Sequence, residues 1–191
     1  MRFCIYGAAS NRIDEKYILA GEALGKAMAR AGHGMVFGGG ASGLMGAAAR
    51  GMTAGGASEI IGIAPSFFDV DGVLYPGCTE MIYTETMRER KQKMEEMADG
   101  FIITPGGVGT MDEFFETLTF KSLGLHDKPI GVLNVDHFYD DLEKLIEKMA
   151  GGNFLRQGIQ EMFFIGEDPE ELVREMEKQS GIVFAKPDFK Y

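Results

Sequence analysis

Short hydrophobic runs alternate with amphipathic segments along almost the whole 191-residue chain. Runs such as "RFCIYG" and "GFIITP" are typical of buried strands, whereas residues 14–31 and 86–98 carry apolar positions at helical spacing. Strands separated by helices favour a parallel sheet with helices on both faces. The pattern therefore predicts an α/β protein with a Rossmann-like, doubly wound, mainly parallel sheet, in a single domain over residues 1–191.

The expected elements follow one another in regular order. Strands are expected at "RFCIYG", "GMVFGGG", "SEIIGIAP", "MIYTE", "GFIITP", "PIGVLN" and "MFFIG". Helices are expected at about 14–31, in "LMGAAARGMTAGG", at about 86–98, after Thr110, near 137–150 and from Pro169. Residues 66–79 lack periodicity and contain Pro76 and several glycines, so we expect a loop over the functional face.

Composition and charge narrow the classes of function. The formal net charge of -10 argues against general nucleic-acid binding, which relies on lysine and arginine to neutralise phosphates. A helix N-terminus and a few local arginines can still bind one small anion. Cys4 and Cys78 fit neither a metal-ligand spacing nor a disulfide framework, and no segment is long enough to span a membrane. We expect a cytoplasmic protein with no membrane or nucleic-acid partner and no bound metal.

Three glycine-bearing turns, "GAAS", "GGGASG" and "PGGVGT", follow expected strands. In doubly wound sheets, ligands bind beyond the carboxyl ends of the strands, where these turns are expected to lie. "GGGASG" fits the dinucleotide fingerprint, but it follows the second strand and lacks the acidic residue that would bind the ribose about twenty residues later. A nicotinamide or flavin cofactor is therefore disfavoured. A Walker-type loop is disfavoured too, since no lysine and hydroxyl follow the glycines in the required order.

The glycine turns suit a single phosphate group instead. Backbone amides that glycines expose at a helix start can bind a phosphate without a lysine. The candidate donors of the "PGGVGT" turn are Gly106, Gly107, Gly109 and Thr110. From the neighbouring strand end, the residues expected to close the site are Gly39, Gly40, Ser42 and Gly43. The alternative is that these glycines only form tight turns and allow close helix–sheet packing.

Two carboxylates follow the "PGGVGT" turn. Glu113 and Glu116 lie three residues apart, so they project from the same face near a helix start. The helix dipole favours ionised carboxylates there, which suits stabilising positive charge on a sugar or orienting a water better than it suits a general acid. Alternatively, Thr110 and Glu113 form a capping box with no catalytic role. Asp112 is expected to point elsewhere, into solvent.

Arg90 interrupts an apolar stripe. Met87, Met94 and Met97 recur at helical spacing, and Arg90 falls within this stripe with Lys91 beside it. A cation on the inward face of a helix must be paired or must contact a ligand, because burying it alone is too costly. The alternatives are a substrate contact or a structural ion pair with a core carboxylate. The methionines are typical of a core, although flexible side chains can also line a pocket for a base.

The segments "PGGVGTMDE" and "MRERK", in this order, resemble the LONELY GUY (LOG) family. The first has the family form PGGxGTxxE and the second resembles the family's arginine–lysine helix. The segments "YGAAS" and "GGGASGLMG" extend the resemblance over most of the chain, to about residue 165. Members are cytokinin riboside 5'-monophosphate phosphoribohydrolases, formerly described as possible lysine decarboxylases.

The resemblance implies a Rossmann-like fold and hydrolysis of the N-glycosidic bond of a purine or cytokinin nucleoside 5'-monophosphate. The products would be the free base and ribose 5-phosphate, formed without a metal or organic cofactor by a homodimer or higher homo-oligomer. The family's essential arginine and glutamate fall on Arg90 and Glu113, and Glu116 matches a further acidic position. The family's arginine–lysine helix adds Met87 and Lys91 as candidate substrate contacts. Arg88 departs from plant members, which often carry histidine there.

These inferences lead to one expected arrangement: Arg90 and Glu113 share a cavity beside a phosphate bound by the glycine turn. Arg90 is too basic to act as a general acid, so we expect it to donate hydrogen bonds to the purine or the phosphate. Glu116 would hold the sugar or steady Arg90. Two alternatives remain open. One is a nucleotide-binding or carrier protein of the same fold; the other is a pyridoxal phosphate-dependent decarboxylase, for which no lysine has a distinctive sequence context.

Overall fold

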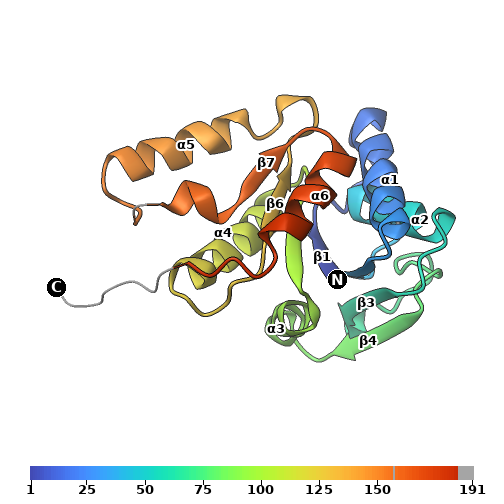
Figure 1. Ribbon diagram of the computed structural model, residues 1–191. Helices are drawn as coiled ribbons and strands as arrows, with labels where there is room; N and C mark the ends of the chain where they lie inside the picture. Colours follow the sequence, from blue (N-terminus) through green and yellow to red (C-terminus); the bar gives the residue numbers. More distant parts are fainter. Residues whose placement is uncertain (157, 185–191) are drawn as a thin grey trace.

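The computed structural model describes residues 1–156 and 158–184 (Figure 1). Over these residues the strands form one seven-stranded sheet in which every neighbouring pair is parallel, in the order β4-β3-β2-β1-β5-β6-β7. The strands are β1 (Arg2–Tyr6), β2 (Gly34–Phe37), β3 (Ile60–Pro65), β4 (Glu80–Thr84), β5 (Gly100–Ile103), β6 (Ile130–Leu133) and β7 (Phe164–Gly166). The predicted Rossmann-like α/β fold with a parallel sheet is confirmed.

Helices cover both faces of this sheet. They are α1 (Glu15–Arg30), α2 (Gly43–Ala54), α3 (Met87–Met97), α4 (Val108–Ser122), α5 (Asp140–Gly151) and α6 (Pro169–Gln179). Helices α1, α2 and α6 lie on one face, and α3, α4 and α5 on the other (Figure 1). Successive residues of β1 alternate between the two cores: Phe3 and Ile5 belong to the core under the first group of helices, and Cys4 and Tyr6 to the core under the second. This alternation follows from the two-residue period of a strand, so both faces of the central strand are apolar. Within the described residues, no helix is long and apolar enough to cross a membrane.

The chain reverses its direction of travel across the sheet between β1 and β5. The first strands run outward from β1 to β4, and α3 then returns the chain to β5, which pairs with β1 on its other side. After β1 the chain enters α1 on one face, and after β5 it enters α4 on the opposite face. In doubly wound folds, ligands bind at such a switch point, beyond the carboxyl ends of the strands. The "PGGVGT" turn follows β5 at this edge of the sheet, as predicted.

Helix α4 begins earlier than the sequence indicated. We expected it after Thr110, but its first residue is Val108 and its N-cap is Gly107, with no side-chain cap. Thr110 is buried inside the first turn, where its hydroxyl packs against Gly106 at a place where a Cβ on that glycine would collide. The alternative of a capping box between Thr110 and Glu113 is therefore wrong, because Thr110 is not the cap.

The connection after β6 also differs from the prediction. Residues Val135–His137 form a separate 3-10 turn, so α5 begins at Asp140 rather than near residue 137. Residues 66–79 form a loop as expected, apart from a 3-10 turn at Ser66–Phe68. This loop runs beside the "GGGASG" turn: Ala41 donates to the Val73 carbonyl at 2.9 Å.

Candidate functional site

Arg90 of α3 and Glu113 of α4 meet at the carboxyl edge of the sheet. Nη1 of Arg90 lies 3.7 Å from Oε1 of Glu113, and the side chains are only 10% and 12% exposed. Nε of Arg90 also donates to the Ile63 carbonyl at the end of β3, at 3.2 Å. Arg90 and Glu113 thus lie side by side, as expected; that they share a cavity beside a bound phosphate stays a prediction. The contact by itself fits both a catalytic pair and a structural ion pair.

A glycine makes room for the Arg90 guanidinium. Gly38 follows β2 directly, and a Cβ at this position would collide with Nη2 of Arg90. The side chain can therefore lie flat against the strand end on its way to Glu113. Sequence reasoning included Gly38 in the "GGGASG" motif but gave it no role. The sequence did contain a signal for this role: a glycine at a strand end, in a chain in which Arg90 is a cation on the inward face of a helix.

The pKa of the Glu113 carboxyl group lies near neutral pH. Burial raises its pKa to about 7, and nearby Arg90 and Lys91, which favour the ionised form, offset this only in part. The helix dipole was expected to favour the ionised form of Glu113, but desolvation by burial outweighs that preference. A carboxyl group with a pKa near the working pH is present in both protonation states and can accept a proton in a reaction.

Lys91 organises the two neighbouring carboxylates. Its Nζ lies 2.6 Å from Oε2 of Glu116 and 2.9 Å from Oδ2 of Asp112. The predicted support of Arg90 by Glu116 is not what the structure shows, since Glu116 pairs with Lys91 instead. Asp112 is exposed as expected but is paired. A recess of about 600 Å³ lies between α3 and α4 beside this cluster; its lining residues are Arg88, Lys91, Gln92, Glu95, Glu116 and Phe120.

The start of α4 presents free backbone amides. The helix's first backbone hydrogen bond runs from Met111 to the Gly107 carbonyl at 3.1 Å, so the N–H groups of Val108, Gly109 and Thr110 have no partner within the helix. Gly107 and Gly109 are exposed, and the space where a Cβ would project from either is open. An uncapped helix N-terminus of this kind suits a phosphate.

The start of α2 is different, because its first amides are already occupied. Gly43 donates to Oδ1 of Asn11 at 2.8 Å, and Leu44 donates to the Ala8 carbonyl at 2.9 Å. The Ser42 hydroxyl accepts from Nδ2 of Asn11 at 3.0 Å. The segment that follows β1 thus satisfies this helix end. A phosphate contact by Ser42 or Gly43 stays a prediction, and the geometry gives both residues a packing role.

The other glycines of the "GGGASG" turn also have local partners. Gly39 has a φ of 75°, a conformation that glycine adopts without strain, and its carbonyl accepts from the Tyr75 N–H at 2.7 Å. Gly40 forms an isolated antiparallel bridge with Leu74. A phosphate contact by Gly39 or Gly40 also stays a prediction.

The methionine stripe of α3 divides between core and surface. Met94 is fully buried, and Met97 packs against the same core cluster. Met87, the first residue of α3, is partly exposed at the edge where Arg90 and Glu113 lie. Met87 is therefore the member of the stripe that a ligand can reach.

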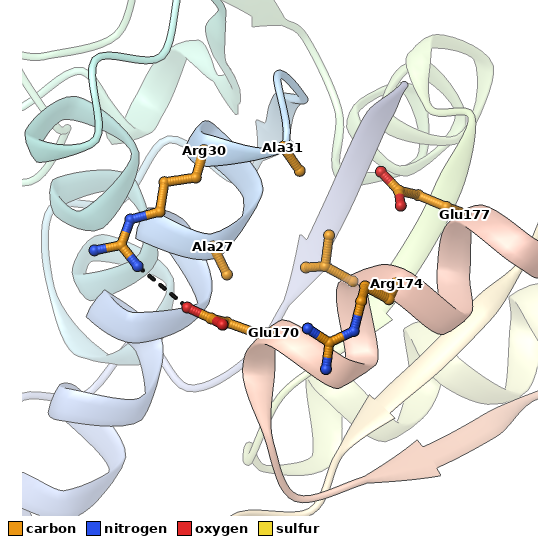
Figure 2. A pocket seen from close by; sticks show the side chains of 7 residues that line it. Ala27, Arg30, Ala31, Glu170, Arg174 and Glu177 are labelled. Carbon is orange, nitrogen blue, oxygen red and sulfur yellow. Dashed lines mark hydrogen bonds and ion pairs between the residues drawn. The ribbon is translucent and has the colours of Figure 1, made fainter.

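A second groove lies away from this edge, between α1 and α6. Figure 2 shows charged side chains of both signs projecting from the two helices, with an ion pair of 3.1 Å between Arg30 and Glu170. The groove has a volume of about 220 Å³ and is lined by Ala27, Arg30, Ala31, Glu170, Val173, Arg174 and Glu177. It contains neither the Arg90–Glu113 pair nor the free start of α4, so we do not assign the function to it.

One lysine has an environment that the sequence did not reveal. Lys121 is fully buried near the end of α4, and burial lowers its pKa to about 8. Lys121 lies eight positions after Glu113, which corresponds to roughly 12 Å along the helix. Lys121 therefore lies far from the Arg90–Glu113 pair.

The fold and the site together describe an α/β protein. Its buried arginine–glutamate pair lies beside an uncapped helix start, at the switch point of a parallel sheet. The family model described as "Possible lysine decarboxylase" matches residues 45–176. The cytokinin riboside 5'-monophosphate phosphoribohydrolase LOG of Oryza sativa subsp. japonica is 34% identical, over 93% of this chain and 73% of the relative. LOG3 of Arabidopsis thaliana is 33% identical, over 93% of this chain and 82% of the relative. The chain therefore belongs to the LOG family.

Solved structures share the fold at lower identity. A molybdenum cofactor binding protein from Rippkaea orientalis superposes with a TM-score of 0.70 and 20% identity, covering 93% of this chain and 95% of that chain. The Moco carrier protein from Chlamydomonas reinhardtii gives a TM-score of 0.71 and 19% identity, with coverage of 93% and 96%. These similarities concern the fold alone.

Proposed function

We propose that this protein hydrolyses the N-glycosidic bond of a purine or cytokinin nucleoside 5'-monophosphate, of the AMP nucleosidase type, releasing the free base and ribose 5-phosphate. The relatives named as cytokinin riboside 5'-monophosphate phosphoribohydrolases support this activity. The observation that carries the proposal is that free amides and the buried Glu113 belong to the first turns of one helix. Gly109 and Glu113 are four residues apart in α4, or roughly 6 Å along its axis. This spacing lets a ribose lie between a bound phosphate and the carboxylate.

The reaction places positive charge on the sugar. As the bond from the anomeric carbon to the base nitrogen breaks, its electron pair leaves with the base and the ribose gains oxocarbenium character. The ionised form of Glu113 stabilises this charge and accepts a proton from the attacking water, whose oxygen forms the new bond to the anomeric carbon. The departing base takes up a proton from solvent, and Glu113 then releases to solvent the proton that it accepted, so the net reaction adds one water across the bond.

Arg90 assists without transferring a proton. A guanidinium stays protonated, so it donates hydrogen bonds to the departing purine or to the phosphate. Its bond to the Ile63 carbonyl fixes Nε, which leaves the terminal nitrogens to face Glu113 and the substrate. Lys91 holds Glu116 beside the sugar site. The phosphate supplies binding energy away from the reacting bond, so a substrate without it loses rate as well as affinity.

The family description as a possible lysine decarboxylase is not the activity we propose. A pyridoxal phosphate enzyme needs a lysine that can lose its proton and form a Schiff base. Burial opposes the charge on Lys91, but its hydrogen bonds to Glu116 and Asp112 prevail and raise its pKa. Lys121 has the lowered pKa, but it lies near the other end of α4, away from the phosphate turn.

The experiment is incubation of the protein with AMP and with adenosine, followed by separation of free adenine. Glu113→Gln and Arg90→Ala are the variants, and Glu170→Gln in the distant α1–α6 groove is the matched control for removal of a carboxylate. We expect adenine from AMP, with loss of activity in the first two variants only. Binding of AMP without release of adenine would instead indicate a nucleotide carrier of the same fold.

The proposal extends to a homodimer or higher homo-oligomer. Apolar side chains are exposed at three places along the carboxyl edge: Phe67 after β3, Met87 after β4 and Val108 after β5. Val108 is 88% exposed. A partner subunit that covers this edge would remove these side chains from water, which stabilises association. Light scattering of the purified protein measures the assembly.

A further inference from the structure

A buried tyrosine holds the phosphate turn from below. Tyr139 immediately precedes α5 and is only 3% exposed, and its hydroxyl donates to the Thr104 carbonyl at 2.8 Å. Thr104 connects β5 to the "PGGVGT" turn. The backbone N–H of Gly106 faces the phenolic oxygen and works against the rise in the pKa of Tyr139 that burial causes. One hydroxyl thus contacts the turn at its entry and at its first glycine.

The turn is fixed on its other side by β1. The N–H and the hydroxyl of Thr104 both donate to the Tyr6 carbonyl, each at 2.8 Å. The Pro105 carbonyl accepts from Ala8 at 3.0 Å. The Thr104 carbonyl is not used in these contacts, and it accepts the hydrogen bond from Tyr139 instead. The turn is therefore held between the central strand and the β6–α5 connection.

The placement of Tyr139 depends on its own supports. Oδ1 of the buried Asn134, just after β6, accepts from the Tyr139 N–H at 2.6 Å, and its Nδ2 donates to Asp140 at 2.8 Å. The chain between them passes through Asp136 and His137, which have φ values of 51° and 60°. Two successive non-glycine residues in this region are strained, and such strain persists only where the surrounding structure enforces it.

We propose that Tyr139, positioned by Asn134, sets the geometry of the phosphate turn, so that the free amides at the start of α4 face the phosphate of the substrate. Tyr139 is a positioning residue, since its hydroxyl contacts the turn and is too deeply buried to reach the ligand. This inference rests on the proposed phosphate site. It adds a requirement from outside the "PGGVGT" motif, namely the connection after β6.

The test compares Tyr139→Phe with the wild-type protein by titration with ribose 5-phosphate in a calorimeter. The variant keeps the ring but leaves the Thr104 carbonyl without its buried donor, so we expect affinity to fall about tenfold. Ile146→Val, which removes one methylene from the core face of α5, the helix that Tyr139 precedes, controls for general destabilisation and should bind as the wild type does. Asn134→Ala should weaken binding in the same direction as Tyr139→Phe.

Hydrogen exchange gives a readout that needs no ligand. The Gly106 amide should exchange about tenfold faster in Tyr139→Phe than in the wild type, with no such change in Ile146→Val. Equal affinity and equal exchange in Tyr139→Phe and wild type would overturn the inference, as would equal losses in Tyr139→Phe and Ile146→Val. If the wild type binds ribose 5-phosphate but releases no base from AMP, the proposed function fails while the positioning role stands. Absence of ribose 5-phosphate binding by the wild type would overturn both.

Discussion

Replacing Glu113 by glutamine should stabilise the protein at alkaline pH. The carboxyl group has a pKa of about 7 in the fold, against an ordinary value of 4.5, because burial disfavours its charge. This difference corresponds to about 3 kcal/mol at a pH above both values. The favourable contribution of the protonated form is fully present below pH 4.5 and is lost as the pH rises through 7. Glutamine imitates the protonated form at every pH.

Urea denaturation at pH 5 and pH 8 measures this effect. The advantage of Glu113→Gln over the wild type, in free energy of unfolding, should grow by about 2 kcal/mol between the two pH values. Glu116→Gln is the control, because it removes the negative charge that lies 2.6 Å from Lys91 and should not stabilise the protein at pH 8. An advantage of Glu113→Gln that is the same at both pH values would refute the reasoning. Glu113→Gln should also lose hydrolase activity, because functional sites retain groups that lower the stability of the fold.

Two further substitutions test the geometry of the site. Val108→Pro removes one free amide at the first position of α4, where proline is tolerated. Calorimetry should therefore show that the variant binds ribose 5-phosphate about tenfold more weakly and has an unchanged Tm. Val108→Ala is the control, and equal binding by both variants would contradict the amide site. Gly38→Ala should displace the Arg90 guanidinium and lower kcat/KM for AMP about 100-fold; unchanged kinetics would show that Arg90 does not need that space.

The fold was predictable because its signals are local. Apolar runs mark the strands, and their separation by helices requires parallel pairing. That Arg90 needs a partner was predictable as well, since a cation inside an apolar stripe must be paired or must contact a ligand. That Glu113 belongs to the same site was implied by the resemblance to the LOG family and not by periodicity.

The details that failed depend on contacts between distant segments. The start of α4 is set by packing of Thr110 on Gly106, which the capping pattern does not encode. The first amide of α2 is taken by Asn11, 32 residues away in sequence, so a glycine-rich turn that looks free is satisfied. The raised pKa of Glu113 follows from burial under tertiary packing, whereas sequence reasoning saw only the helix dipole.

The most direct test of the account is the initial rate of base release from AMP and from adenosine at equal concentrations. AMP should release adenine at least about 100-fold faster than adenosine does, because the amides at the start of α4 would bind only the phosphorylated substrate. Equal rates from the two substrates would contradict it, and so would an absence of adenine from AMP.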